Sequence, residues 1–206
     1  MVRLAKGLLI EPGATVAALV GGKRKYYLNP FTFAAICITI VLLLNGWFNL
    51  NVDPTTYDPK LVAAQPVVIQ ATYVFDTINF KLMDLATVLM SPWFAFCLWI
   101  FFRKRDRNIA EITLAVMLFI AFATLLTRTF MIPIVVTVFN GNTYNWFQII
   151  ELLLQAIYLA WGISTFFNYK TFGGFFKVLW VVCLAGIVGI ALELAIISFL
   201  IVNGII

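Results

Sequence analysis

Long apolar runs separated by short polar turns dominate this chain. A helix needs about 20 predominantly apolar residues to cross roughly 30 Å of hydrocarbon. Five runs approach that length, so the pattern predicts an all-α membrane protein in which a five-span transmembrane helical bundle follows an N-terminal amphipathic interfacial segment. The predicted spans cover residues 31–48, 82–102, 109–128, 146–167 and 178–201. We expect the whole chain, residues 1–206, to form a single membrane domain.

The third apolar run is too long for one span and too short for two. It continues to residue 139 and is interrupted by Arg128 and Pro133. A helix over residues 109–139 would be about 46 Å long at 1.5 Å per residue, which exceeds the thickness of the hydrocarbon core. We therefore expect the span to end near Arg128, and residues 129–139 either to protrude or to fold as a short half-helix.

Residues 1–30 alternate basic and apolar positions over short stretches. This pattern predicts one or two amphipathic pieces lying on the cytoplasmic leaflet, where anionic lipid headgroups attract lysine and arginine. A basic and aromatic group stands directly before the first span and is a predicted contact for lipid or for a protein partner. Its members are Lys23, Arg24, Lys25, Tyr26 and Tyr27. Beside a span, such a group favours lipid headgroups over RNA.

The distribution of lysine and arginine predicts the orientation of the spans. Eleven of the fourteen basic residues lie before span one, in the turn at 103–107, or between spans four and five. Only Lys60 and Lys81 lie in loops on the other side, and Arg128 lies at the end of a span. Basic loops stay in the cytoplasm, so we expect a bacterial inner-membrane protein with its N-terminus inside and its C-terminus outside.

Composition agrees with a membrane environment and excludes several kinds of chemistry. The chain is 63 % apolar and 11 % charged, and it contains no histidine. The lack of histidine excludes histidine-based triads and most metal centres. The cysteines are Cys37, Cys97 and Cys183, which stand alone inside apolar runs and predict neither a disulfide framework nor a zinc site. We therefore expect no enzyme activity, no cofactor and no metal.

Charged side chains inside the predicted spans are the candidate functional residues. A charge at the bilayer centre costs at least about 2.5–3.5 kcal/mol, so each one needs a physical reason. The predicted topology brings Asp84, Arg128, Glu151 and Glu193 to the outer leaflet. An excess of acids over bases there would favour cations. The alternative is structural: Arg128 pairs with one carboxylate, and the other acids are protonated or reach the interface.

Spans four and five each carry a polar or small-residue face. Gln148, Glu151 and Gln155 fall at i, i+3 and i+7, which is one face of a helix. On span five, Gly189 and Ala185 lie on the same face as Glu193. Small residues allow helices to approach closely in membranes, so Glu193 is expected to face protein rather than lipid.

One segment resembles a known family. Glu11-Pro12-Gly13, followed by Gly22-Lys23-Arg24-Lys25-Tyr26-Tyr27-Leu28-Asn29-Pro30-Phe31-Thr32-Phe33, is similar to the signature of a bacterial integral-membrane family of unknown function. That signature is roughly P-G, an amphipathic stretch, and G-K-R-x-x-Y-x-x-P-F-x-F before the first span. Many members carry a cysteine-rich segment before it, which this chain lacks. The resemblance implies a basic collar at the cytoplasmic interface, preceded by a reentrant or surface helix.

Two functions of different kinds are compatible with these features. The first is a homo-oligomeric channel or pore-like effector whose protomers line a conduit with the polar intramembrane residues. By analogy of size and span count alone, this includes accessory proteins of bacterial antiviral systems. The second is a non-conducting scaffold that binds lipid or a protein partner through the basic collar. Of the two, the sequence favours the channel, and the scaffold is the alternative.

Overall fold

The computed structural model is entirely helical over the residues it describes, which confirms the predicted all-α class. It describes residues 2–22, 29–47, 66–67, 70, 74, 90–103, 107–139, 144–169 and 171–203. The helices are α1 (Val2–Ile10), α2 (Pro12–Val20), α3 (Pro30–Trp47), α6 (Ser91–Phe101), α7 (Ile109–Phe139), α8 (Tyr144–Phe166) and α9 (Phe172–Val202).

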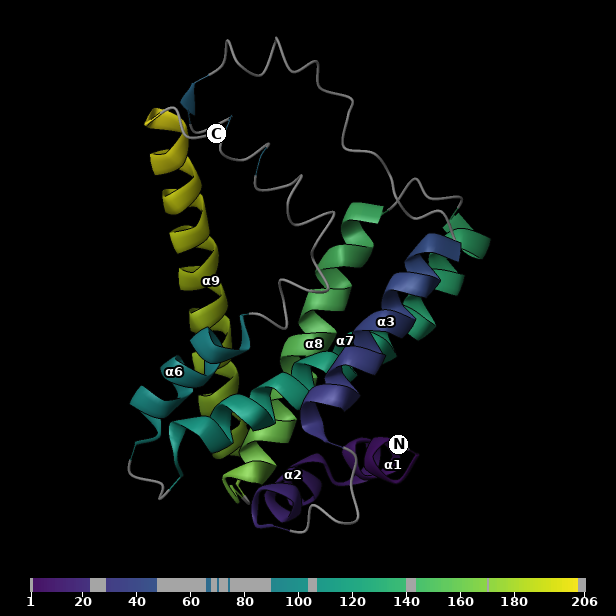
Figure 1. Ribbon diagram of the computed structural model, residues 1–206, viewed down its shortest axis with the longest axis vertical. Helices are drawn as coiled ribbons and strands as arrows, with labels where there is room; N and C mark the ends of the chain where they lie inside the picture. The colour runs from purple at the N-terminus through teal and green to yellow at the C-terminus, as the bar shows by residue number, and fades with distance from the viewer. Residues whose placement is uncertain are drawn as a thin grey trace.

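The long helices alternate in direction between the two ends of the bundle (Figure 1). α3, α7 and α9 begin at the end where α1 and α2 lie, and α6 and α8 finish there. We call this the α1–α2 end. Short connections between consecutive helices favour such antiparallel neighbours, and the turn between α6 and α7 spans only residues 102–108.

Helix α7 forms the centre of the bundle and packs against α3, α6 and α8. Every side chain from Ala115 to Ala123 is buried, as expected for a helix that is apolar on all sides. Its packing against α8 is close at Gly162, where an added Cβ would lie 3.0 Å from the Phe119 ring. In a membrane, close packing of this kind holds helices together because lipid is as apolar as the side chains.

Helix α9 is packed much more lightly than α7. Only 11 % of its most apolar stretch is buried, and Trp180 and Ile187 are each 70 % exposed. One face is an exception, because Ala185 and Gly189 pack against α6, where the Trp93 indole donates a 3.0 Å hydrogen bond to the Ala185 carbonyl. The predicted small-residue face is thus a helix contact, while most of α9 faces outward.

Three described helices are long and apolar enough to cross a membrane. They are Ile109–Met131 within α7, Ile149–Phe166 within α8, and α9. Pro30–Leu44 and Ser91–Phe101 are shorter apolar helices. The first eight residues of predicted span two, 82–89, lie outside the described residues. The structure is therefore that of a helical protein compatible with multiple membrane passes.

Helix boundaries differ from the predicted ones in two places. α7 runs unbroken through Arg128 and Pro133 to Phe139, so residues 129–139 extend the helix and do not form a separate half-helix. Apolar surroundings tolerate a proline inside a helix when nearby groups satisfy the freed carbonyl. α9 begins at Phe172, earlier than the predicted residue 178.

The N-terminal segment consists of two helices, within the one or two pieces expected. In α1, Leu4 and Leu8 lie one turn apart and are buried, while Arg3 and Lys6 are exposed. The apolar face of the segment therefore joins the core of the bundle and packs against α7 and α8. α1 is amphipathic, and its apolar side meets protein and not lipid.

Candidate functional site

Arg128 of α7 and Glu151 of α8 form an ion pair inside the bundle. The Arg128 Nε atom lies 2.8 Å from Glu151 Oε1, and the two side chains are 6 % and 5 % exposed. A buried charge without a partner costs several kcal/mol. Each residue therefore offsets the cost of burying the charge of the other. The pairing matches the structural alternative for Arg128, in which it engages one carboxylate.

Two more polar side chains extend this pair into a cluster. The Gln155 amide donates hydrogen bonds to Glu151 Oε1 at 3.1 Å and to Thr127 Oγ1 at 3.2 Å. The Thr127 hydroxyl in turn lies 3.4 Å from Glu151 Oε1. Glu151 and Gln155 share a face of α8 as their spacing predicts. Thr127 was not predicted, because a threonine in an apolar helix commonly bonds its own backbone.

The remaining predicted intramembrane residues are not joined to this cluster by a hydrogen bond or ion pair among the residues described. Glu193 is half-buried on α9, which leans away from α8 above their shared lower end (Figure 1). Gln148 lies on α8, but its side chain is outside the described part of the structure. Asp84 and the basic group at residues 23–27 also lie outside it.

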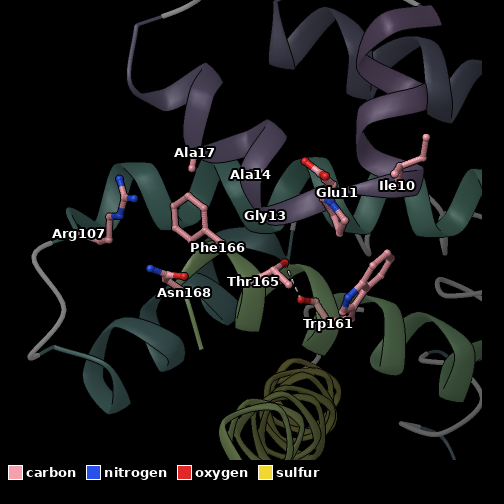
Figure 2. A pocket seen from close by; sticks show the side chains of 11 residues that line it. Ile10, Glu11, Gly13, Ala14, Ala17, Arg107, Trp161, Thr165, Phe166 and Asn168 are labelled. Atoms are coloured by element: carbon pink, nitrogen blue, oxygen red, sulfur yellow. Dashed lines mark hydrogen bonds between the residues drawn. The ribbon is translucent and has the colours of Figure 1, made fainter. Parts of the chain in front are cut away.

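A pocket of about 470 Å³ lies at the α1–α2 end, between α2 and the end of α8 (Figure 2). Its lining combines two charged residues with polar, aromatic and small ones. The lining residues are Ile10, Glu11, Pro12, Gly13, Ala14, Ala17, Arg107, Trp161, Thr165, Phe166 and Asn168. Figure 2 shows Glu11 and Arg107 on opposite sides, with Gly13 and Phe166 between them.

Gly13 allows the two walls of the pocket to meet. A Cβ atom at this position would collide with the backbone of Thr165 and Phe166. The first turn of α2 therefore contacts the last turn of α8 backbone to backbone. The Pro-Gly pair at 12–13 fits this place, since Pro12 occupies the first turn of the helix and Gly13 permits the contact.

The end of α8 shapes the floor of the pocket through a specific C-cap. The backbone N–H of Tyr169 donates to the Ser164 carbonyl at 2.9 Å, and that of Asn168 donates to Thr165 at 3.0 Å. This pair of bonds is the Schellman motif, which requires a left-handed residue. Asn168 fills that position with φ of 58° and turns the chain at the edge of the pocket.

Arg107 is held in place by two contacts. Its Nη1 atom lies 3.4 Å from Glu111 Oε2, one helical turn further along the chain, and its guanidinium lies 4.9 Å from the centroid of the Phe166 ring. Two other cations near this end also lie over aromatic rings: Arg103 over Trp99 and Lys177 over Phe102. The α1–α2 end is therefore rich in cations and aromatic rings.

The pocket was not among the predicted sites. Its charged residues, Glu11 and Arg107, are far apart in the sequence, and each has an ordinary local explanation. The only local signal was Glu11-Pro12-Gly13, which marks a helix start without indicating what it packs against. Within the described residues, no group of three or more acidic or cysteine side chains is placed to hold a metal ion.

Comparison of the chain with protein-family models, with curated proteins and with solved structures found no match. The resemblance of residues 11–33 to a bacterial membrane family therefore stays a prediction.

Proposed function

We propose that this chain is a five-span protein of a bacterial inner membrane, with its N-terminus in the cytoplasm and its C-terminus outside. The alternating helix directions support this topology (Figure 1). The described cations that are predicted to face the cytoplasm all belong to segments at the α1–α2 end. They are Arg3, Lys6, Arg103, Arg107 and Lys177. Such a one-sided distribution is typical of a cytoplasmic face.

Within that membrane we propose a non-conducting scaffold that binds lipid headgroups at its cytoplasmic face. The ion pair between Arg128 and Glu151 carries this proposal. A cation conduit through this part of the bundle would need the Glu151 carboxylate to face water, whereas its oxygen lies 2.8 Å from Arg128 and its side chain is 5 % exposed. The acid braces α7 against α8, and the exposed charged side chains among the described residues lie at the α1–α2 end.

A homo-oligomeric channel is the second candidate, and Glu193 is the residue that favours it. This carboxylate is half-buried on the lightly packed helix α9, with no ion-pair partner among the described residues. A ring of protomers contacting through α9 would bring several copies of Glu193 together, and rings of acidic side chains select cations.

Flux through liposomes separates the two candidates. We expect purified protein in liposomes to give no more potassium or dye leak than empty liposomes, with or without an applied voltage. A leak above that background would contradict the scaffold. If the leak also disappears in Glu193→Gln but persists in Glu111→Gln, the channel is the correct function. Glu111→Gln is the control because Glu111 lies in the first turn of α7 and already pairs with Arg107.

A further inference from the structure

We propose that the pocket between α2 and the end of α8 binds the phosphoethanolamine headgroup of a phospholipid. This inference rests on the proposed lipid-binding scaffold and gives that function a site and a ligand. The pocket carries one cation and one anion, Arg107 and Glu11, on opposite sides (Figure 2). A ligand complementary to both carries an anionic and a cationic group a short distance apart, as a zwitterionic headgroup does.

The Arg107 side of the pocket suits a phosphate. Guanidinium groups bind phosphate oxygens through paired charge-assisted hydrogen bonds. Glu111 and the Phe166 ring hold this guanidinium in place at 3.4 Å and 4.9 Å, so less side-chain entropy is lost on binding.

The Glu11 side suits a primary ammonium group. Glu11 is exposed at the pocket rim, and Trp161 lies on the same side (Figure 2). A primary ammonium donates three hydrogen bonds and pairs with a carboxylate, and an indole face attracts cations. A quaternary choline group would instead need a cage of aromatic rings. The lining has two aromatic side chains, and Arg107 already lies over the second, Phe166.

Size and position agree with a headgroup. A volume of about 470 Å³ lies within the roughly 300–1,000 Å³ of small-ligand sites. Trp161 is 37 % exposed near the end of α8, and tryptophan is enriched at the level of lipid headgroups. With the proposed topology, the pocket opens in the cytoplasmic interface, where phospholipid is the abundant zwitterion.

Calorimetric titration of the full-length protein in detergent tests the site. The titrants are short-chain phosphatidylethanolamine, phosphatidylcholine and phosphatidylglycerol, with soluble phosphoethanolamine as a fourth. We expect phosphatidylethanolamine to bind about tenfold or more tightly than the other two lipids, the difference of one charge-assisted hydrogen bond. Equal binding of the three lipids would overturn the proposal. If soluble phosphoethanolamine binds as tightly as phosphatidylethanolamine, the ligand of the pocket is the free headgroup compound and not a lipid.

Two variants assign the two halves of the pocket. Glu11→Gln should lose the preference for ethanolamine over choline while its affinity for phosphatidylcholine is unchanged, which also shows that the pocket is folded. Arg107→Gln should weaken the binding of both lipids equally. Lys177→Gln, a charge change at the same end but outside the pocket, should alter neither. Preference retained in Glu11→Gln would overturn the assignment.

These measurements do not depend on conduction. A protein that leaks ions yet distinguishes the headgroups would overturn the scaffold and support the pocket. A protein that is silent in liposomes yet binds the three lipids equally would overturn the pocket alone.

Discussion

The Tyr158 hydroxyl donates a 2.8 Å hydrogen bond to the backbone carbonyl of Leu8, across 150 positions of sequence. In a continuous helix this carbonyl would accept a hydrogen bond from the N–H of residue 12. Residue 12 is proline, which has no N–H, and the chain bends at Glu11 between α1 and α2. Tyr158 therefore supplies the donor that Pro12 removes, and it fixes the N-terminal helix pair to α8.

Removing that hydroxyl should loosen the N-terminal helix pair. In Tyr158→Phe the carbonyl of Leu8 loses its donor in a part-buried place, which costs about 1–3 kcal/mol. Unfolding of detergent-solubilised protein by denaturant measures this loss. Thr113→Val is the control, because the Thr113 hydroxyl bonds only the carbonyl of Ile109 in its own helix; an equal loss in both variants would contradict the role of Tyr158.

Gly13 should tolerate no side chain. In Gly13→Ala the added methyl meets the backbone of Thr165 and Phe166, and backbone cannot move aside as a flexible side chain can. We expect α2 to separate from α8, with a loss of about 1–3 kcal/mol or more for overpacking. Gly173→Ala is the matched control: nothing lies within 4 Å of its Cβ position, and alanine favours the helix. Equal stabilities would disprove the close contact.

Asn168 should accept glycine better than alanine. Its φ of 58° lies in the left-handed region, where a Cβ-bearing residue other than asparagine or aspartate costs about 1–2 kcal/mol. Asn168→Ala should lower the midpoint of thermal unfolding, and Asn168→Gly should keep or raise it. The opposite order would show that the Asn168 side chain, and not its backbone conformation, stabilises the end of α8.

The helices could be predicted from the sequence because their signals are local. Apolar runs, Pro30 in a first turn and the i,i+4 spacing of Glu151 and Gln155 each act within a few turns. The pairing of Arg128 with a carboxylate was one of the two alternatives that the cost of burying a lone charge left open. Which carboxylate it meets depends on how far α7 is rotated against α8, and that rotation is set by packing such as Gly162 against Phe119.

The pocket could not be predicted because it depends on contacts between residues that are distant in the sequence. It needs the first turn of α2 to meet the last turn of α8, and that contact depends on Gly13, on the left-handed Asn168 and on the hydrogen bond from Tyr158. None of these residues is unusual in its own segment. Arg107 was counted only as one basic residue of a cytoplasmic turn, although it also forms one side of the pocket.

Labelling with a membrane-impermeant thiol reagent should reveal the orientation of the chain. In a background without Cys37, Cys97 and Cys183, a cysteine replacing exposed Lys6 should react only after the cells are opened. A cysteine replacing Asn203, exposed at the end of α9, should react in intact cells. The reverse pattern would contradict the orientation, and labelling of both positions in intact cells would contradict an odd number of spans.

The ion pair between Arg128 and Glu151 should behave as a buried pair. Arg128→Gln and Glu151→Gln each leave one charge without its partner, at a cost of about 3–5 kcal/mol. The double variant removes both charges, so we expect it to be more stable than the sum of the single losses implies, by at least about 1 kcal/mol.

The pair of Arg107 and Glu111 provides the matched control for this cycle. It has a similar chemistry at 3.4 Å, but its side chains are 34 % and 29 % exposed, so water replaces a lost partner. The corresponding glutamine variants should each cost less than about 1 kcal/mol, with little coupling between them. If the two cycles give the same coupling energy, Glu151 is accessible to water and is able to line a conduit at this position.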